Sequence, residues 1–176
     1  MLEVTFDATG KVSDEQTAEN IGELVKYFDG KMLIGAGTVL KTSQVELVKK
    51  VGGSFIISPN TDEAVIKKTR ELGMVSMPGA VTPTEIQQAH NFGASFVKLF
   101  PAGNLGPDYV KAVRAPLSHI KLTAVGGIHD GNMADYIKAG ASDFGIGTNI
   151  VDKKLLAADD YAGITKLAEK YVAVLK

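Results

Sequence analysis

Seven short runs of apolar and β-branched residues recur along the chain, and each is followed by an amphipathic stretch with helical spacing. The runs are Leu2–Phe6, Met32–Gly35, Ser54–Ile57, Met74–Met77, Ser95–Phe100, Ile120–Val125 and Ser142–Ile146. The amphipathic stretches are Thr17–Phe28, Ser43–Val51, Asp62–Leu72, Pro83–Phe92, Pro107–Ala115 and Gly131–Ala139, with a closing helix predicted over Tyr161–Leu175. Successive runs begin roughly 20 to 30 residues apart, which is the length of one strand–helix unit. Strict alternation of strand and helix indicates an α/β fold with an all-parallel sheet.

Glycine-rich turns distinguish the two architectures that this alternation allows, a doubly wound open sheet and a closed barrel. A dinucleotide-binding sheet would carry G-x-G-x-x-G after its first strand, and Leu2–Phe6 is followed by no such sequence. The glycine-rich turns instead follow the last two strands, where barrels place their phosphate sites. We therefore predict a TIM (β/α)8-type barrel that forms a single domain over residues 1–176, with seven visible βα units and the first unit missing.

The composition excludes several classes of function. The 176 residues are 45% hydrophobic and 22% charged, as expected for one soluble domain with a sizeable core. A formal net charge of −1 provides no basic field for nucleic acid or for a membrane surface. The absence of cysteine excludes disulfides, a thiol nucleophile and cysteine-ligated zinc. Because the chain has no apolar run of about 18 residues and opens directly into a strand, we expect no signal peptide, no membrane span and a cytoplasmic location.

Lys98 is the residue most indicative of chemistry. In the fifth predicted strand it shares one face with Phe96 and Phe100, whereas Val97 and Leu99 occupy the other face. A barrel covers both faces of its strands, so the amine of Lys98 would lie in an apolar setting that lowers its pKa. A neutral amine forms an imine with a ketone. For this residue alone, a strand-end lysine that extends its ammonium group into solvent is the alternative interpretation.

Glu3 is the corresponding candidate for acid–base chemistry. Leu2, Val4 and Phe6 form one face of the first strand, and Glu3 lies with Thr5 on the other face. A carboxylate inside a barrel is costly unless it is paired or used, and beside a lysine it would serve as general acid and base. The alternative is an exposed glutamate on an edge strand near the chain terminus.

The turns after the sixth and seventh strands predict a phosphate site. Backbone N–H groups of Gly126, Gly127, Gly147 and Thr148 are expected to converge on an anion without a cationic side chain. Each turn alone is a weak signal, because glycine pairs are common between a strand and a helix. On successive strands the two turns indicate a phosphorylated ligand.

Thr38 ends the second strand in the sequence Gly35-Ala-Gly-Thr-Val39. Its hydroxyl and the neighbouring amides are candidates for substrate binding. A tight turn in which Thr38 begins the next helix is the alternative.

Other polar segments have structural interpretations. Thr82, which precedes a proline and lies three residues before Glu85, predicts a helix N-cap with a capping box. His90, His119 and His129 lie in helix or loop contexts without the spacing of metal ligands. We therefore predict neither a metal site nor a cofactor.

Taken together, these segments resemble the 2-keto-3-deoxy-6-phosphogluconate / 4-hydroxy-2-oxoglutarate aldolase family of class I, Schiff-base aldolases. The matching segments are Glu3–Thr5, Gly35–Val39, Ile57–Pro59, Pro78–Gly79, Thr82–Glu85, Lys98–Pro101, Gly126–Ile128 and Gly147–Thr148. They run in order over nearly the whole chain. The resemblance implies a homotrimer of (β/α)8 barrels that acts on a small phosphorylated keto acid and is a carbon–carbon lyase.

The resemblance also implies roles for individual residues. Lys98 corresponds to the Schiff-base lysine, Glu3 to the acid and base, and Thr38 to a threonine that contacts the pyruvate part of the substrate. Phe100 and Pro59 are further candidates for substrate binding. The two glycine-rich turns correspond to those that hold the phosphate. The implied reaction cleaves 2-keto-3-deoxy-6-phosphogluconate to pyruvate and glyceraldehyde 3-phosphate, with 4-hydroxy-2-oxoglutarate as a second substrate that gives pyruvate and glyoxylate.

Three departures from the family pattern leave the substrate epimer open. The family has an opening strand and helix before the strand that carries Glu3. Asp7 stands where many members have an arginine that holds the substrate carboxylate, so this task would fall to Thr38 and backbone amides, and an inward-facing Asp7 would repel the substrate. Val125 replaces the usual threonine before Gly-Gly. The segments Ser58–Asn60, Gly106–Tyr109 and Ala124–Gly127 are similar to the 6-phosphogalactonate aldolases.

Three alternatives accompany the gluconate interpretation. The first is a 2-keto-3-deoxy-6-phosphogalactonate aldolase. The second is an isomerase or epimerase on the same phosphate-binding barrel, a class that uses carboxylates, cysteine or metal and needs no amine in this strand. The third is a truncated paralogue without catalytic activity.

Overall fold

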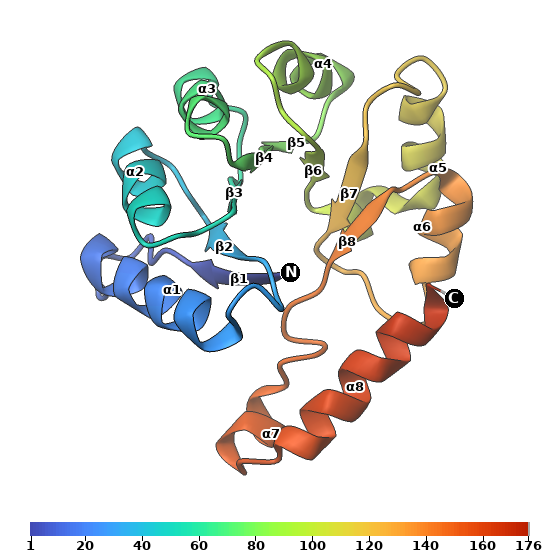
Figure 1. The fold of residues 1–176 in the computed structure, drawn as a ribbon. Helices are drawn as coiled ribbons and strands as arrows, with labels where there is room; N and C mark the ends of the chain where they lie inside the picture. Colours follow the sequence, from blue (N-terminus) through green and yellow to red (C-terminus); the bar gives the residue numbers. More distant parts are fainter. Residues whose placement is uncertain (176) are drawn as a thin grey trace. The chain divides into compact units, whose positions relative to one another are not determined.

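The structure, a computed structural model, describes residues 1–175 of the chain. These residues form two compact units, one from Met1 to Lys98 and one from Leu99 onward. Strands and helices alternate through both units (Figure 1). The predicted α/β fold with parallel strands is therefore confirmed, whereas a single domain stays a prediction.

Four parallel strands form the sheet of the first unit. They are β1 (Leu2–Thr5), β2 (Ile34–Gly37), β3 (Phe55–Ile57) and β4 (Val75–Met77), in the order β1-β2-β3-β4. Two shorter strands follow, β5 (Gly79–Ala80) and β6 (Val97–Leu99), and β6 carries Lys98 at the end of this unit. Glu3 pairs with Gly35 and Thr5 with Gly37, so the carboxyl end of β1 lies beside that of β2. Parallel strands of this kind present their carboxyl ends at one edge, where α/β proteins bind ligands.

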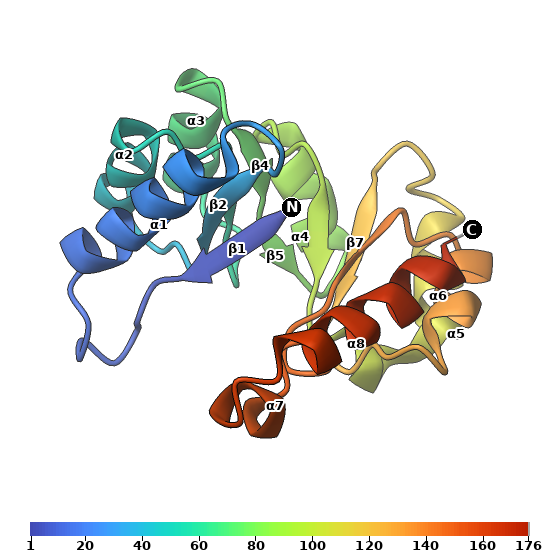
Figure 2. The same cartoon turned by 60° about the horizontal axis from the view of Figure 1, so that its bottom comes forward.

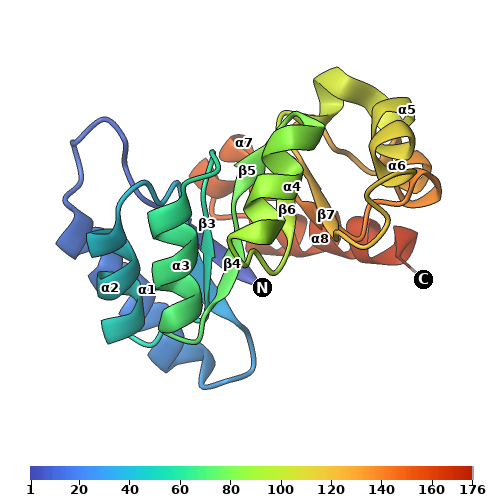
Figure 3. The same ribbon diagram turned by 90° about the horizontal axis from the view of Figure 1, so that it is seen from above.

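Helices cover the sheet of the first unit on its outer side. They are α1 (Asp14–Phe28), α2 (Thr42–Lys50), α3 (Glu63–Glu71) and α4 (Pro83–Asn91). Figure 3 shows α1, α2 and α3 side by side next to the strands. The core between helices and strands consists of fully buried aliphatic and aromatic side chains, among them Phe6, Ile21, Ile34, Val45 and Ile56. Burial of such side chains contributes about 1.5–3 kcal/mol each and holds the strand ends in place.

Three of the four helices of the first unit begin at side-chain caps that the sequence provides. Ser13, Asp62 and Thr82 each accept a hydrogen bond from a backbone N–H in the first turn of their helix. The capping box predicted at Thr82 is confirmed, because the Glu85 carboxylate also accepts from the backbone N–H of Thr82 at 2.7 Å. Such caps satisfy amides that the helix leaves unpaired.

The second unit continues the alternation. Its elements are α5 (Ala102–Arg114), β7 (Leu122–Val125), α6 (Met133–Ala139), β8 (Asp143–Gly145), α7 (Lys153–Ala157) and α8 (Tyr161–Val174). Strands β7 and β8 are parallel, with Thr123 opposite Asp143 and Val125 opposite Gly145. Helices α5 and α6 pack together, and Figure 2 shows the long α8 following the short α7. The Tyr136 hydroxyl donates to the carbonyl of Ala102 at 2.9 Å and so ties α6 to the start of α5.

The predicted elements differ from the observed ones mainly at their ends. Six of the seven predicted strands contain a shorter observed strand, and the second, predicted over Met32–Gly35, lies two residues later as β2. The two-residue β5 and the helix α7 were not predicted. The helix predicted from Pro107 begins earlier, at Ala102, because a first helical turn precedes a break at Gly106, whose φ of 81° is not helical. A proline after such a glycine starts a new helical segment readily, since its nitrogen has no hydrogen to pair.

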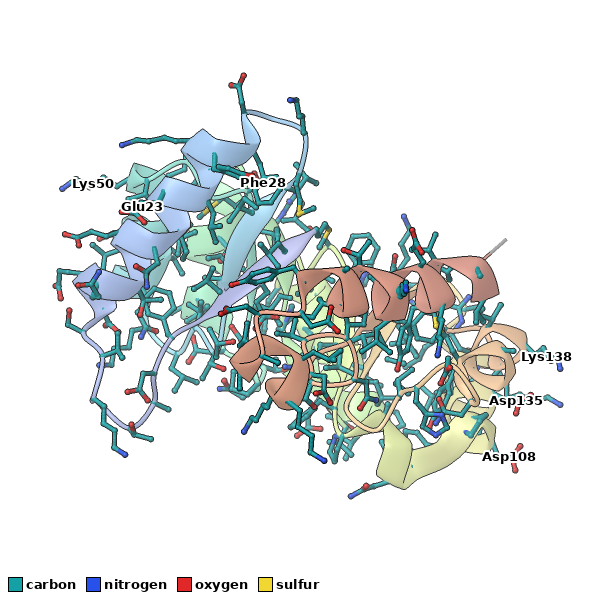
Figure 4. All side chains as sticks on the ribbon, turned by 90° about the horizontal axis from the view of Figure 1, so that it is seen from below. Glu23, Phe28, Lys50, Asp108, Asp135 and Lys138 are labelled. Carbon is teal, nitrogen blue, oxygen red and sulfur yellow. The ribbon has the colours of Figure 1, made fainter. Side chains whose placement is uncertain are left out.

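Charged side chains lie on the outer surfaces of the helices. Figure 4 shows Glu23 and Lys50 in the first unit and Asp135 and Lys138 in the second, all pointing outward. The Lys138–Asp135 pair joins its Nζ and Oδ1 atoms at 3.5 Å, and an exposed pair of this kind contributes little stability. Within residues 1–175 no helix is both long and apolar enough to cross a membrane.

Candidate functional site

Lys98 lies in the middle of β6 with its neighbours buried on the opposite face. Val97 is 1% exposed and Leu99 is fully buried, while Lys98 itself is half-buried. The backbone N–H of Lys98 donates to the carbonyl of Pro78 at 2.8 Å, which fixes the strand at this residue. The predicted division of the strand into two faces is therefore confirmed, and the lysine side chain does not extend freely into solvent.

The environment of Lys98 favours the neutral amine. Burial lowers the pKa of Lys98 below the ordinary value for lysine, because an ammonium ion loses hydration when it is removed from water. The negative charge of Glu3 acts in the opposite direction and raises the pKa of Lys98. A carboxylate of the first strand therefore lies within electrostatic reach of an amine whose basicity is reduced.

The carboxyl group of Glu3 lies over Gly37 on the neighbouring strand. The Thr5 hydroxyl donates to Glu3 Oε1 at 3.1 Å, and a Cβ atom placed on Gly37 would coincide with the carboxyl group of Glu3. Glycine at position 37 therefore leaves the space that the glutamate side chain occupies. Glu3 is exposed and lies on the edge strand β1, as the alternative interpretation expected, and these two contacts fix the position of its carboxyl group.

Thr38 adopts a strained backbone conformation at the end of β2. Its φ is +56°, in the left-handed region that β-branched residues avoid. Such strain costs about 1–3 kcal/mol and concentrates at functional sites. Helix α2 begins only at Thr42, after the N-cap residue Lys41, so the interpretation of Thr38 as a helix-start residue is wrong.

A cavity of about 310 Å³ opens beside Thr38 at the carboxyl ends of β1 and β2. The β1–α1 loop, including Asp7 and Ser13, forms one side, and the β2–α2 segment with Thr38, Lys41 and Gln44 forms the other. Thr38 is the one predicted substrate-binding residue among its lining residues. Glu3 and Lys98 are not among the residues that line this cavity.

The carboxylate of Asp7 is occupied by its own loop. It accepts hydrogen bonds from the N–H and the hydroxyl of Thr9 at 2.8 and 2.7 Å, and from the N–H groups of Lys11 and Val12 at 2.8 and 2.9 Å. These bonds, with the Thr9 hydroxyl as the largest contribution, lower the pKa of Asp7 to about 2. Asp7 therefore acts as the organiser of the β1–α1 loop, a role that the sequence reasoning missed. An aspartate followed two residues later by threonine is the local signal that indicates such a loop.

Pro59 lies at the end of β3 and is in close contact with Gly79. A Cβ atom on Gly79 would collide with the carbonyl of Pro59, and the Thr61 hydroxyl donates to the carbonyl of Gly79 at 2.9 Å. Pro59 itself is exposed at the carboxyl end of the strand.

The predicted phosphate-binding residues all belong to the second unit. Gly126 and Gly127 follow β7 with φ values of 84° and 74°, two consecutive left-handed residues that only glycine adopts without strain. Gly147 and Thr148 follow β8 and are exposed. Within residues 1–175 none of the backbone hydrogen bonds uses the N–H of these four residues as its donor. Their amides are therefore available to an anion.

Phe100 packs against the glycine turn in the same unit. A Cβ atom on Gly126 would lie 3.0 Å from the Phe100 ring, which is itself 40% exposed. Gly103 approaches the turn even more closely, since its own Cβ position lies 2.8 Å from the Gly127 Cα atom. The turn is thus enclosed on one side by the segment that follows β6.

Two asparagines that the sequence reasoning missed contact the first glycine turn. The Asn132 side-chain amide donates to the carbonyl of Gly127 at 3.0 Å, and that of Asn149 donates to the carbonyl of Ile128 at 2.9 Å. Asn149 directly follows Gly147 and Thr148, so its bond connects the two turns. Its place immediately after a predicted phosphate turn was the only sequence signal.

The histidines do not form a ligand set. His129 Nδ1 accepts a hydrogen bond from the N–H of Gly131 at 3.2 Å within its own loop. In the part of the chain that the structure describes, no group of three or more His, Asp or Glu side chains is arranged to hold a metal ion.

Comparisons with known proteins agree on one family. Residues 1–167 match the family model described as KDPG and KHG aldolase. The chain is 45% identical over 141 residues to a protein of Rhizobium meliloti (strain 1021) named "Probable 2-dehydro-3-deoxy-6-phosphogalactonate aldolase", covering 80% of this chain and 66% of that protein. It is 38% identical over 152 residues to the 2-dehydro-3-deoxy-6-phosphogalactonate aldolase of Escherichia coli (strain K12), covering 85% and 74%. The chain thus spans slightly less than two thirds of the length of the first relative.

Solved structures show the same relationship. A structure described as native KDPGal superposes with a TM-score of 0.84 at 33% identity, covering 98% of this chain and 82% of that one. The KDPG aldolase from Legionella pneumophila, with pyruvate captured as a covalent carbinolamine intermediate, superposes with a TM-score of 0.82 at 26% identity, covering 94% and 77%. On the match of residues 1–167 and on these relatives, the chain belongs to the KDPG and KHG aldolase family.

Proposed function

We propose that the chain is a class I aldolase that cleaves 2-keto-3-deoxy-6-phosphogalactonate to pyruvate and glyceraldehyde 3-phosphate through a Schiff base on Lys98. The observation that carries the proposal is the amine of Lys98, whose pKa is lowered by burial beside the carboxylate of Glu3. The names of the two relatives described above support the galactonate epimer over the gluconate epimer, which was the first choice from the sequence. They also favour an aldolase over an isomerase or a non-catalytic paralogue.

Lys98 is the nucleophile in this mechanism. Its neutral amine attacks the C2 ketone of the substrate and forms a carbinolamine, and loss of water gives the protonated imine. Glu3 transfers the protons that these steps require. The carbinolamine reported for pyruvate in the Legionella pneumophila relative is the first of these intermediates.

Glu3 is the general base for cleavage of the carbon–carbon bond. Its carboxylate takes the proton of the C4 hydroxyl, the C3–C4 bond breaks, and the electron pair moves into the imine to give an enamine. Glyceraldehyde 3-phosphate leaves as the aldehyde. Protonation of the enamine at C3 and addition of water to the resulting imine release pyruvate and restore the amine of Lys98. The hydrogen bond from Thr5 and the space above Gly37 hold the Glu3 carboxylate for both proton transfers.

Uncharged groups bind the two anionic ends of the substrate in this proposal. The hydroxyl and the adjacent amides of Thr38 receive the carboxylate, and the strained φ of Thr38 turns these groups out of the strand. Asp7, which lines the cavity beside Thr38, keeps its negative charge, and its two oxygens accept four hydrogen bonds from donors of its own loop. The amides of Gly126, Gly127, Gly147 and Thr148 bind the phosphate, with Phe100 and Pro59 as further substrate contacts.

Borohydride trapping tests the chemistry directly. Incubation with pyruvate and sodium borohydride should add one reduced adduct to the intact mass, and peptide mapping should place it on Lys98. An adduct on a different lysine, or no adduct on folded protein, would exclude the mechanism. Initial cleavage rates with the two epimeric substrates then decide between galactonate and gluconate, with 4-hydroxy-2-oxoglutarate as the third substrate to compare. The family resemblance further supports a cytoplasmic homotrimer, which light scattering of the purified protein measures.

A further inference from the structure

The three carbonyl groups of the first glycine turn are each held by a donor from a different segment of the second unit. The carbonyl of Gly126 accepts from the N–H of Gly103 at 2.7 Å, that of Gly127 from the side chain of Asn132 at 3.0 Å, and that of Ile128 from the side chain of Asn149 at 2.9 Å. Because a peptide unit is planar and trans, the N–H that follows each carbonyl points in the opposite direction. Fixing the first two carbonyls therefore fixes the directions of the N–H groups of Gly127 and Ile128. The third carbonyl, of Ile128, belongs to the peptide unit whose N–H, that of His129, donates to Asn132 Oδ1 at 2.9 Å.

We propose that Asn149 is a positioning residue that joins the two glycine turns into a single phosphate site. This inference rests on the proposed phosphate-binding function of those turns. Asn149 lies next to Gly147 and Thr148 in the chain, and its side-chain amide reaches Ile128, 21 residues away, in the other turn. The amides of the two turns therefore keep a fixed separation, which an anion bridging them requires.

Asn132 has a different role although it makes a similar bond. Its side chain donates to the carbonyl of Gly127 and accepts from the N–H of His129 at 2.9 Å, so both of its bonds lie within the first turn. It shapes that turn but does not connect it to the second. The second turn is shaped locally as well, since the N–H groups of Ile150 and Val151 both donate to the carbonyl of Gly147. Of these contacts, the bond of Asn149 is the one that couples the two turns.

The chemical requirement at position 149 is a donor. The Ile128 carbonyl accepts and cannot donate, so an ionised carboxylate at position 149 would face it with like partial charge. Asn149→Asp therefore removes the link while keeping the shape of the side chain. Asn149→Ala removes the link without adding a charge near the anion, and the two variants together separate loss of the bond from electrostatic repulsion of the ligand.

Inorganic phosphate is the probe for the first measurement. Asn149→Ala should bind phosphate about tenfold more weakly than the wild type by calorimetry or thermal shift, the usual effect of losing one aligned hydrogen bond, and Asn149→Asp should bind it more weakly still. The matched control is Asn91→Ala on the exposed surface of α4, which also removes one asparagine hydrogen bond, from Gln87 at 2.8 Å. The control should bind phosphate as the wild type does. Binding by Asn149→Ala within twofold of the wild type would overturn the proposal.

A comparison of two aldehydes separates a positioning role from a general loss of structure. In the condensation direction, Asn149→Ala should raise the KM for glyceraldehyde 3-phosphate about tenfold, with a much smaller change for unphosphorylated glyceraldehyde. Equal losses with both aldehydes would show a structural role and overturn the proposal.

Failure of this inference and failure of the proposed function give different results. If the wild type traps pyruvate on Lys98 and Asn149→Ala binds phosphate normally, the inference falls and the aldolase stands. If phosphate binding depends on Asn149 and no adduct forms on Lys98, the inference stands and the aldolase mechanism falls. A wild type that binds no phosphate at all would remove the inference, while the trapping result would still decide the chemistry.

Discussion

The two units of the chain carry their predicted chemistry in different chemical groups. In the first unit the functional groups are side chains, an amine at Lys98 and a carboxylate at Glu3, and burial and the nearby charge set the basicity of the amine. In the second unit the functional groups are backbone amides, and the conformation of glycine residues such as Gly126 and Gly127 makes them available. Activity that depends on a side chain is therefore lost when its reactive group is removed. Binding that depends on backbone amides of glycine residues is lost when a side chain is added.

Replacement of the amine should have the largest effect. Lys98→Arg keeps the positive charge but provides no nucleophile, so cleavage should fall on the order of 10⁴-fold or more. Borohydride with pyruvate should leave no adduct on the variant, as read by intact mass. Because this change leaves the second unit unaltered, phosphate should still stabilise the variant as it does the wild type. Residual cleavage within tenfold of the wild type would assign the chemistry to another residue.

Removal of the Glu3 charge should slow cleavage of the substrate but allow borohydride trapping on Lys98 at lower pH. Glu3→Gln takes away the proton carrier, and cleavage should fall about 10²- to 10⁴-fold. The Glu3 charge raises the pKa of Lys98, so its removal should lower that pKa further and leave more neutral amine at a given pH. The pH midpoint for borohydride trapping should therefore move to lower values. A midpoint that moves to higher pH would contradict the electrostatic link between the two residues.

Added atoms test the backbone site. Gly147 has no heavy atom within 4 Å of its Cβ position, so Gly147→Ala should fold normally. The new methyl group would occupy the side of the turn that faces the anion, and phosphate affinity should fall roughly 10- to 100-fold, or about 1.4 to 2.7 kcal/mol. Gly127→Val should abolish the phosphate-dependent thermal shift and also destabilise the fold, because the Cβ position lies 2.9 Å from the Gly103 Cα atom and the φ is 74°. An unchanged thermal shift in both variants would place the phosphate elsewhere.

Thr38 combines both kinds of chemistry, a hydroxyl and a strained backbone. Thr38→Gly should raise the KM for pyruvate in the condensation direction about tenfold through loss of the hydroxyl. The same change relieves the strain at φ +56°, and after the greater flexibility of unfolded glycine is subtracted it should raise the free energy of unfolding by up to about 1 kcal/mol. Steady-state kinetics and urea unfolding provide the two measurements. Lower stability together with an unchanged KM would show that Thr38 serves the fold alone.

Asp143 is a titrating side chain in the second unit, where the proposed phosphate site uses backbone amides. Within the described residues, its Oδ2 atom and the Thr123 hydroxyl opposite it on β7 are buried without a hydrogen-bond partner. Burial raises the pKa of Asp143 above its ordinary value, and the charge of Lys121 opposes this shift. A raised pKa in the folded state means that its contribution to stability is present at low pH and is lost as the pH rises through that pKa.

The corresponding variant should therefore be more stable at high pH. Asp143→Asn removes the ionisation and should raise the free energy of unfolding at pH 8 by about 1 kcal/mol, because a neutral amide costs less to bury than an ionised carboxylate. The dependence of the free energy of unfolding on pH should become flatter, as measured by urea unfolding between about pH 4 and pH 8. This range starts near the ordinary pKa of aspartate and extends above it. A variant that keeps the slope of the wild type would assign the titration to another group.

The periodic features of the sequence predicted the fold and the side-chain part of the site. Alternation in β6 placed Lys98 opposite buried neighbours, which agrees with the structure, whereas in β1 Glu3 is exposed and its neighbours on the other face are only partly buried. The bonds of Asn149 and Asn132 were not predicted, because they depend on which segments meet in space and not on spacing along the chain. The prediction for Asp7 came from comparison with the arginine that many family members have at this position. It did not anticipate the hydrogen bonds that the Asp7 carboxylate accepts within its own loop.

The contact between Glu3 and Gly37 has a consequence for how the family can vary. The glutamate side chain on β1 fills the space that a side chain at position 37 on β2 would need, so substitutions at the two positions depend on each other. A saturation library at position 37 would tolerate Ala or Ser only in backgrounds where position 3 has become shorter, and the two substitutions would rescue each other. Covariation between these two columns of a family alignment, with glycine at one wherever glutamate stands at the other, is the evolutionary record that such a shared volume should leave.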